Sequence, residues 1–248
     1  KEDKGKERRT LEEWEVKALR KSASSTEGLN QRQIDQKKHI PLFIDIGLFC
    51  GLRRGEILAL KWGDIVDKGH FKDQWKEGGW KLQITDGKLE EPTEADTQAY
   101  LDASYSDFAF RVEGATTKTK QTRLVPIAKE LVKALKGYYT KQMMEGSEED
   151  FGKLLEDNSF LGIHPDHRDI RIFPFTSVQN AFSTARKNAG LDNEITLHSL
   201  RHHFCTKALE SGMSLHCVKD LAGHASIVTT ERYLHANPKV KFEQYQMF

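Results

Sequence analysis

The chain of 248 residues has little cysteine, no low-complexity tract and no long hydrophobic run. Its three cysteines, Cys50, Cys205 and Cys217, form no Cys-x-x-Cys pair, and their odd number argues against a disulfide framework. We therefore expect buried, reduced thiols in a cytoplasmic protein. The longest apolar stretch covers residues 40–52 and contains Asp45, whereas a membrane helix needs about 20 apolar residues. This stretch is therefore too short to span a bilayer, and the charged start KEDKGKERRT predicts no signal peptide.

The chain also lacks a marked net charge, because 38 Lys and Arg nearly balance 37 Asp and Glu. The balance is uneven along the chain. Residues 1–40 carry 11 basic and 8 acidic side chains, residues 66–114 carry 6 and 11, and residues 115–248 carry 18 and 15. An acidic segment thus lies between mildly basic ones. A basic face for nucleic acid is compatible with this pattern, and a solvated surface of mixed charge explains it equally well.

Helical patterns dominate, and no internal repeat is present. The helix at 10–23 has Thr10 as its expected N-cap, and a more apolar helix is expected to stop at Gly51. Further helices are expected at 54–62, 128–145, 176–190, 198–212 and 214–223, with a last short helix around Tyr233. Aromatic and β-branched residues predict strands at 80–85, 108–113 and 123–127. The expected fold class is mixed, mainly α with a small antiparallel β-sheet.

The segment TLHSLRHHFCTKAL carries the first candidate site residues. On a helix, His198 and Arg201 lie one turn apart on the same face. His198 and His202 also have the spacing of a zinc-binding helix, but Ser199 stands where the general-base glutamate belongs and no third ligand has a known spacing. Packing in a helical core is the other explanation for His202 and His203.

Three more segments contain residues that suit phosphate chemistry. GLRRGE places Arg53 after a glycine turn at the head of a helix, whereas Arg54 suits a surface charge. ATTKTKQTRLVPI places Lys118 before a strand. LAGHASIVTTERY places His224 nine positions before Tyr233. Most tyrosines pack with a polar tip at the surface, so Tyr233 in isolation reads as a packing residue.

Together, the order Arg, Lys, His-x-x-Arg, His and Tyr resembles the signature of the tyrosine recombinases, the phage integrase family, over roughly residues 8–238. The resemblance implies a tyrosine recombinase catalytic-domain-like fold. It also implies a site-specific recombinase that cleaves and rejoins DNA through a 3′-phosphotyrosine, for integration or excision of a mobile element such as a phage or conjugative transposon. The implied catalytic residues are Arg53, Lys118, His198, Arg201, His224 and Tyr233, with Glu56 in a supporting role.

These residue types suit attack by a phenol on a phosphodiester. A free tyrosine ionises near pH ~10 and needs activation, and guanidinium groups such as Arg53 and Arg201 clamp phosphate oxygens in bidentate fashion. His198 donates to the same phosphate or assists proton removal, and His224 binds a phosphate oxygen. In the family the leaving 5′-oxygen takes its proton from the hairpin lysine.

Two lysines compete for that last role. Lys120 is the alternative to Lys118, but the eight positions from Lys118 to Pro126 match the family spacing. No carboxylate cluster for Mg²⁺ is apparent in the sequence, and arginine, lysine and histidine donors can replace the charge of a metal. We therefore expect no metal and no cofactor.

The 65 positions between Arg53 and Lys118 exceed the spacing of compact members such as the Xer recombinases. The excess predicts an acidic insert at about residues 66–114. We expect residues 1–9 to be the remnant of an interdomain linker, 10–236 the catalytic domain and 237–248 a C-terminal tail.

The resemblance implies double-stranded DNA as the partner, a homo-oligomer that is a tetramer on paired sites in the full-length protein, and no membrane contact. Two other functions remain open. One is DNA relaxation by a type IB topoisomerase-like enzyme, which shares this catalytic set. The other is a non-enzymatic helix-turn-helix-type DNA-binding protein built on ALESGMSLHCVKDLAGHA, which would not need Tyr233.

Overall fold

The computed structural model describes residues 10–27, 34, 37–67, 83–85, 88–90, 105–114, 122–143, 163–211, 213 and 215–235. The predicted linker at 1–9, the predicted tail at 237–248, Lys118 and Lys120 lie outside these ranges. The helices are α1 (Glu13–Ser24), α3 (Ile40–Cys50), α4 (Arg54–Ala59), α7 (Lys129–Met143), α9 (Gln179–Asn188), α10 (Leu197–Glu210), α11 (Leu215–Ala222) and α12 (Ile227–His235), with 3-10 turns η1 (Trp62–Asp64) and η4 (Pro165–His167). The strands are β1 (Ile65–Asp67), β2 (Gln83–Thr85), β3 (Lys88–Glu90), β4 (Tyr105–Val112) and β5 (Arg123–Ala128).

Three of the strands form an antiparallel sheet in the order β1-β4-β5, while β2 and β3 pair with each other. Ile65 lies opposite Phe110, which in turn lies opposite Val125. The strands predicted at 108–113 and 123–127 are β4 and β5, whereas β1 was not predicted. The predicted fold class, mainly helical with a small antiparallel sheet, is confirmed.

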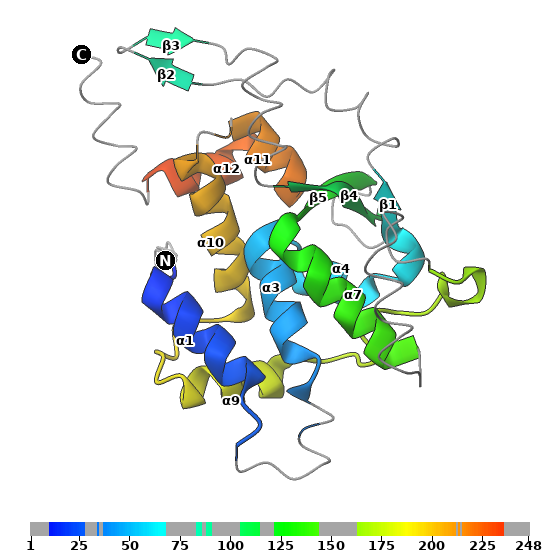
Figure 1. Ribbon diagram of the computed structural model, residues 1–248. Coiled ribbons are helices and arrows are strands. Elements are labelled where there is room, and N and C mark those ends of the chain that lie inside the picture. The colour runs from blue at the N-terminus through cyan, green and yellow to red at the C-terminus, as the bar shows by residue number, and fades with distance from the viewer. Residues whose placement is uncertain are drawn as a thin grey trace, which may run out of the picture.

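Helix α3 lies in the middle of the helical part of the molecule (Figure 1) and packs against α1, α7, α10 and β5. Nine of its eleven residues are buried, as expected of a helix that is apolar on all sides. Its buried Asp45 forms an ion pair with Arg20 of α1, in which Asp45 Oδ1 lies 2.8 Å from Arg20 Nε. The helix ends at Gly51, which adopts the left-handed conformation with φ 63°, so the predicted stop is confirmed.

Helix α4 is shorter than predicted, because it ends at Ala59 instead of continuing to Trp62. The cause is pairing with a distant segment. Trp62 N donates to Ile170 O at 3.0 Å, and Ile172 N donates to Leu60 O at 2.9 Å. These tertiary hydrogen bonds use the backbone groups that a longer helix would have paired internally.

The predicted N-cap of the first helix is also wrong. Glu12 is the N-cap of α1. Thr10 instead donates its hydroxyl to Thr206 Oγ1 on α10, at 3.1 Å. The contact joins residues nearly two hundred positions apart, which a local sequence pattern does not report.

Helices α10, α11 and α12 enclose a second, smaller hydrophobic cluster beside the main core, and α11 also packs against β5. Its buried members are Phe204, Cys205, Ala208, Met213, Cys217, Val218, Leu221, Ala222 and Tyr233. The three cysteines are free and buried, as expected. Within the described ranges, no helix combines the length and the apolar character that crossing a bilayer requires.

Candidate active site

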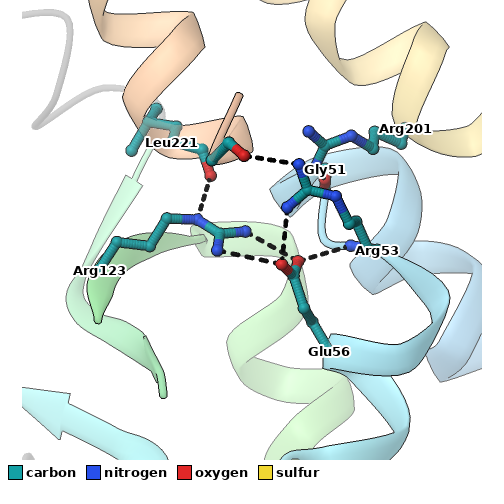
Figure 2. A network of polar contacts seen from close by, with 7 residues as sticks. Gly51, Arg53, Glu56, Arg123, Arg201 and Leu221 are labelled. Carbon is teal, nitrogen blue, oxygen red and sulfur yellow. Dashed lines mark hydrogen bonds and ion pairs between the residues drawn. The ribbon is translucent and has the colours of Figure 1, made fainter. Parts of the chain in front are cut away.

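Arg53 is the N-cap of α4, two residues after the left-handed turn at Gly51. Its backbone N–H and its Nη1 donate to the carboxylate of Glu56 at 2.8 and 2.9 Å. Its Nη2 donates to Gly223 O at 2.5 Å, which joins α4 to the end of α11 (Figure 2). Glu56 is buried, and Arg54 is exposed, as expected of a surface charge.

Arg201 lies on α10 and is only 2% exposed. Its Nη1 donates to Gly51 O at 2.8 Å, and its buried Nη2 makes no hydrogen bond within the described part of the chain. Burial lowers the pKa of Arg201 to about 10, and the nearby charge of Arg53 acts in the same direction. The guanidinium therefore stays charged at neutral pH with one nitrogen available for a further acceptor.

His224 follows α11 and is buried beside these arginines. Its Nδ1 lies 2.9 Å from the hydroxyl of Thr230. Burial lowers the pKa of His224 to about 3, assisted by the charges of Arg201 and Arg53 and by His198. His224 is therefore neutral at physiological pH. His198 is exposed in the first turn of α10.

Tyr233 lies on α12 and is buried in the smaller hydrophobic cluster. Its ring stacks on His224, with centroids 5.8 Å apart and an interplanar angle of 11°, and lies 4.7 Å from the ring of His202. Burial raises the pKa of Cys205 to about 11, while the charge of Arg201 and a hydrogen bond with Tyr233 oppose the rise. The phenol ring thus contacts two imidazoles, and its hydroxyl lies beside a thiol.

Several neighbours of these residues were not predicted from the sequence. Arg123, the first residue of β5, donates to both carboxylate oxygens of Glu56 and to Leu221 O. The only local signal for it is its place at the start of RLVPI. Cys205 lies one helical turn after Arg201 and therefore on the same face of α10. His202, for which packing in a helical core was one of two explanations, is partly buried and places its ring against that of Tyr233.

The structure thus brings four predicted residues and Glu56 into one region: Arg53, Arg201, His224 and Tyr233. His198 also approaches this region, since it influences the pKa of His224. Lys118 lies outside the described residues, so its position relative to the cluster stays a prediction. The region combines buried positive charge with a phenol, a combination suited to binding a phosphate next to a nucleophile.

Comparison with known protein families assigns this chain to one of them. The model of the phage integrase family matches residues 99–239, more than half of the chain. The chain belongs to the phage integrase family. The matched region contains Lys118, His198, Arg201, His224 and Tyr233, whereas Arg53 and Glu56 precede it.

Relatives within this family are tyrosine recombinases. The chain is 33% identical over 129 residues to a tyrosine recombinase of Pseudothermotoga lettingae, a match that covers 51% of this chain and 38% of the relative. The chain spans about two-fifths of the length of the curated relatives it matches.

Two solved structures share the fold. The crystal structure of XerA recombinase superposes with a TM-score of 0.55 at 23% identity, covering 96% of this chain and 62% of that one. The Tn1549 transposon integrase, solved in complex with circular intermediate DNA, superposes with a TM-score of 0.53 at 19% identity, covering 98% and 68%. The expected tyrosine recombinase catalytic-domain-like fold is thus confirmed.

Proposed function

We propose that residues 10–236 are the catalytic domain of a site-specific DNA recombinase, flanked by a linker and a C-terminal tail. Tyr233 is the nucleophile in this proposal, and Arg53, Lys118, His198, Arg201 and His224 bind or protonate the phosphodiester. Family membership supports the proposal. The observation that carries it is the buried Nη2 of Arg201, which makes no hydrogen bond within the described residues and belongs to a positive cluster beside Tyr233.

The charge of the cluster favours an anion. The guanidiniums of Arg53 and Arg123 share the carboxylate of Glu56, and Arg201 donates to a neutral carbonyl. This leaves buried positive charge in excess, which is costly unless an anion compensates it. A phosphodiester would provide that compensation, and the pentacovalent transition state would provide more, because negative charge gathers on its nonbridging oxygens.

The proposed step exchanges one ester bond for another. The phenolic oxygen of Tyr233 forms a bond to phosphorus, and the bond from phosphorus to the 5′-oxygen breaks. The phenolic proton passes to a base, with His198 as the candidate. The leaving 5′-oxygen takes a proton from Lys118. The covalent 3′-phosphotyrosine preserves the ester, so the 5′-hydroxyl of another duplex can reverse the step without an energy source.

His224 acts in this proposal as a neutral hydrogen-bond donor. Because burial and neighbouring charges keep its pKa near 3, the ring carries one proton at neutral pH. When the Thr230 hydroxyl donates to Nδ1, that proton resides on Nε2. The Nε2–H can then donate to a phosphate oxygen.

The partner in this proposal is double-stranded DNA, and the full-length protein acts as a homo-oligomer, a tetramer on paired sites. We assign it to the integration or excision of a mobile element, a phage or a conjugative transposon. The Tn1549 transposon integrase, which shares the fold and was solved with DNA, supports this role by analogy.

The test is covalent capture. The full-length protein is incubated with nicked duplexes of randomised sequence, in which the short cleaved strand diffuses away and traps the adduct. The adduct is isolated under denaturing conditions, its DNA is sequenced and its peptide is identified by mass spectrometry. We expect a phosphorylated peptide that contains Tyr233, and a defined DNA sequence. Tyr233→Phe should bind the selected duplex without forming an adduct.

The matched control is Tyr138→Phe, which removes a phenol that contacts His39 in the main core and should leave the adduct intact. An adduct that persists in Tyr233→Phe would refute the nucleophile. Joined products from two selected duplexes identify a recombinase. Relaxation of a plasmid without joined products would replace the proposal with a type IB topoisomerase, and sequence-specific binding without any adduct would indicate a non-enzymatic DNA-binding protein.

A further inference from the structure

Arg123 is fully engaged by the protein itself. Its Nη1 and Nη2 donate to Oε1 and Oε2 of Glu56 at 3.1 and 2.8 Å, and its Nε donates to Leu221 O at 2.9 Å (Figure 2). Its side chain is 11% exposed. All three guanidinium nitrogens thus have acceptors in the protein, so Arg123 differs from Arg201, whose Nη2 makes no hydrogen bond within the described residues.

The carboxylate that Arg123 holds also positions Arg53. Glu56 Oε1 accepts from Arg53 Nη1 at 2.9 Å, and Oε2 accepts from the Arg53 backbone at 2.8 Å. Burial acts to raise the pKa of Glu56, but the hydrogen bonds and charge of Arg123, followed by the hydrogen bonds of Arg53, outweigh it and lower that pKa. Arg123 therefore keeps Glu56 ionised in the form that orients Arg53.

The second acceptor of Arg53 depends on Arg123 as well. Arg53 Nη2 donates to Gly223 O, and Arg123 Nε holds Leu221 O two residues earlier at the end of α11. The guanidinium of Arg123 also packs directly against Gly223. A Cβ built on that glycine would lie 2.8 Å from both Cζ and Nη1 of Arg123. The turn that Arg123 supports leads straight into His224.

We propose that Arg123 is a positioning residue of the recombination site. This inference rests on the proposed function. Arg123 fixes both acceptors of Arg53, the Glu56 carboxylate and the Gly223 carbonyl, and thereby aims Arg53 at the scissile phosphate. It contacts neither the phosphate nor the nucleophile. Loss of Arg123 displaces the Arg53 guanidinium from its position for the phosphate while leaving the DNA-binding surface in place.

The experiment measures single-turnover adduct formation and DNA affinity with the duplex selected by covalent capture. Arg123→Met and Arg123→Lys are compared with Arg111→Met. Arg111 is a matched control, because it lies on the neighbouring strand β4, opposite Leu124, and forms ion pairs with Asp64 and Glu113. We expect Arg123→Met to slow adduct formation by about a hundredfold while changing the dissociation constant less than about threefold, since a small misplacement affects the chemical step most.

A second substrate distinguishes positioning from stability. A methylphosphonate at the scissile position replaces one nonbridging oxygen by methyl and removes the negative charge that Arg53 neutralises. On this duplex the rate defect of Arg123→Met relative to wild type should shrink at least about tenfold, because the position of the Arg53 guanidinium matters less when the phosphate carries no charge. The rate defect of Arg53→Met should shrink for the same reason. Arg123→Lys should show the same contraction from a smaller starting defect, since it keeps the positive charge beside Glu56 but cannot make all three hydrogen bonds.

Wild-type rates for both Arg123 variants would overturn the inference, and so would an equal defect on the charged and the neutral duplex. Thermal unfolding of each variant identifies any that fails to fold, and the lysine variant then carries the test. Absence of an adduct with the wild-type protein would refute the proposed function, an outcome distinct from failure of this inference.

Discussion

At the scale of single residues, the two buried arginines Arg201 and Arg186 allow a sharp comparison. Arg201 Nη1 donates to Gly51 O, and Arg186 Nη1 donates to Asp192 O at 3.2 Å. Each also has one buried nitrogen without a hydrogen bond in the described structure. Only Arg201 belongs to the cluster around Tyr233. Replacing arginine by lysine therefore removes similar hydrogen-bonding groups at both sites, but we expect it to affect function only at Arg201.

We expect Arg201→Lys to reduce the rate of adduct formation by roughly a hundredfold, since the single nitrogen of lysine cannot hold the place of Nη1 at Gly51 O and also present Nη2 to the phosphate. Arg186→Lys should cost about 1–3 kcal/mol of unfolding free energy through its lost hydrogen bond and leave the rate unchanged. Quench-flow with the selected duplex and urea titration measure the two effects. A wild-type rate for Arg201→Lys would exclude Arg201 from the clamp.

The buried imidazole of His224 predicts a pH dependence of stability. Its pKa in the folded protein is lowered to about 3, mainly by burial, whereas an unfolded histidine titrates near pH ~6.5. Between these values the unfolded chain binds a proton that the folded chain does not. The stabilising contribution is therefore complete above about pH 6.5 and is lost as the pH falls, with a limiting slope of about 1.4 kcal/mol per pH unit.

Replacing the group should flatten that slope. His224→Gln is expected to show a shallower decrease of unfolding free energy than wild type between about pH 6 and 4. His216→Gln, which changes an exposed histidine on α11, serves as the control and should follow wild type. Urea titrations across this range measure the difference. Parallel curves for wild type and His224→Gln would show that His224 does not titrate as described.

At the scale of elements, the end of α11 depends on a glycine. Gly223 has φ 66°, and an added Cβ would lie 2.8 Å from the guanidinium of Arg123. Gly190, which follows α9, has φ 69° and no atom within 4 Å of a built Cβ. The two glycines thus share a left-handed backbone, and only one also has a steric constraint.

Alanine at the two positions separates these contributions. Gly190→Ala should cost about 1 kcal/mol of unfolding free energy, through backbone strain alone. Gly223→Ala should cost about 2–4 kcal/mol, because the methyl group also displaces Arg123, and it should slow adduct formation as well. Urea titration and the adduct assay test both statements. Equal costs at the two sites would mean that the guanidinium moves aside freely.

The ends of helices also show where the local sequence pattern no longer predicts the structure. Gly51 was predicted to end α3, because glycine suits the left-handed conformation of a helix terminus. The early end of α4 and the use of Thr10 could not be predicted. In both cases a partner more than a hundred positions away takes the hydrogen bonds that the local pattern would have used. Strand β1 has three residues, too few for an alternating pattern.

At the scale of the whole molecule, the spaced motifs predicted more of the site than any single segment did. Arg53, Arg201, His224 and Tyr233 lie on or beside four different helices and nevertheless converge. In the proposed reaction the chemistry sets their residue types, so their order can be recognised in the sequence. The residue types at Arg123 and Cys205 follow instead from contacts in the folded chain. Arginine and cysteine occur in many surroundings, and only the folded chain identifies which carboxylate or phenol they contact.

The shared carboxylate of Glu56 has an evolutionary consequence. If Glu56 is replaced by a neutral residue, two guanidiniums are left facing each other without a counter-charge; if Arg123 is replaced, a buried carboxylate loses its main partner. Either change alone is penalised, and a paired change to uncharged residues also removes the carboxylate that accepts two hydrogen bonds from Arg53. In descendants of this chain that keep the proposed activity, positions 53, 56 and 123 should therefore keep their arginine, carboxylate and arginine together.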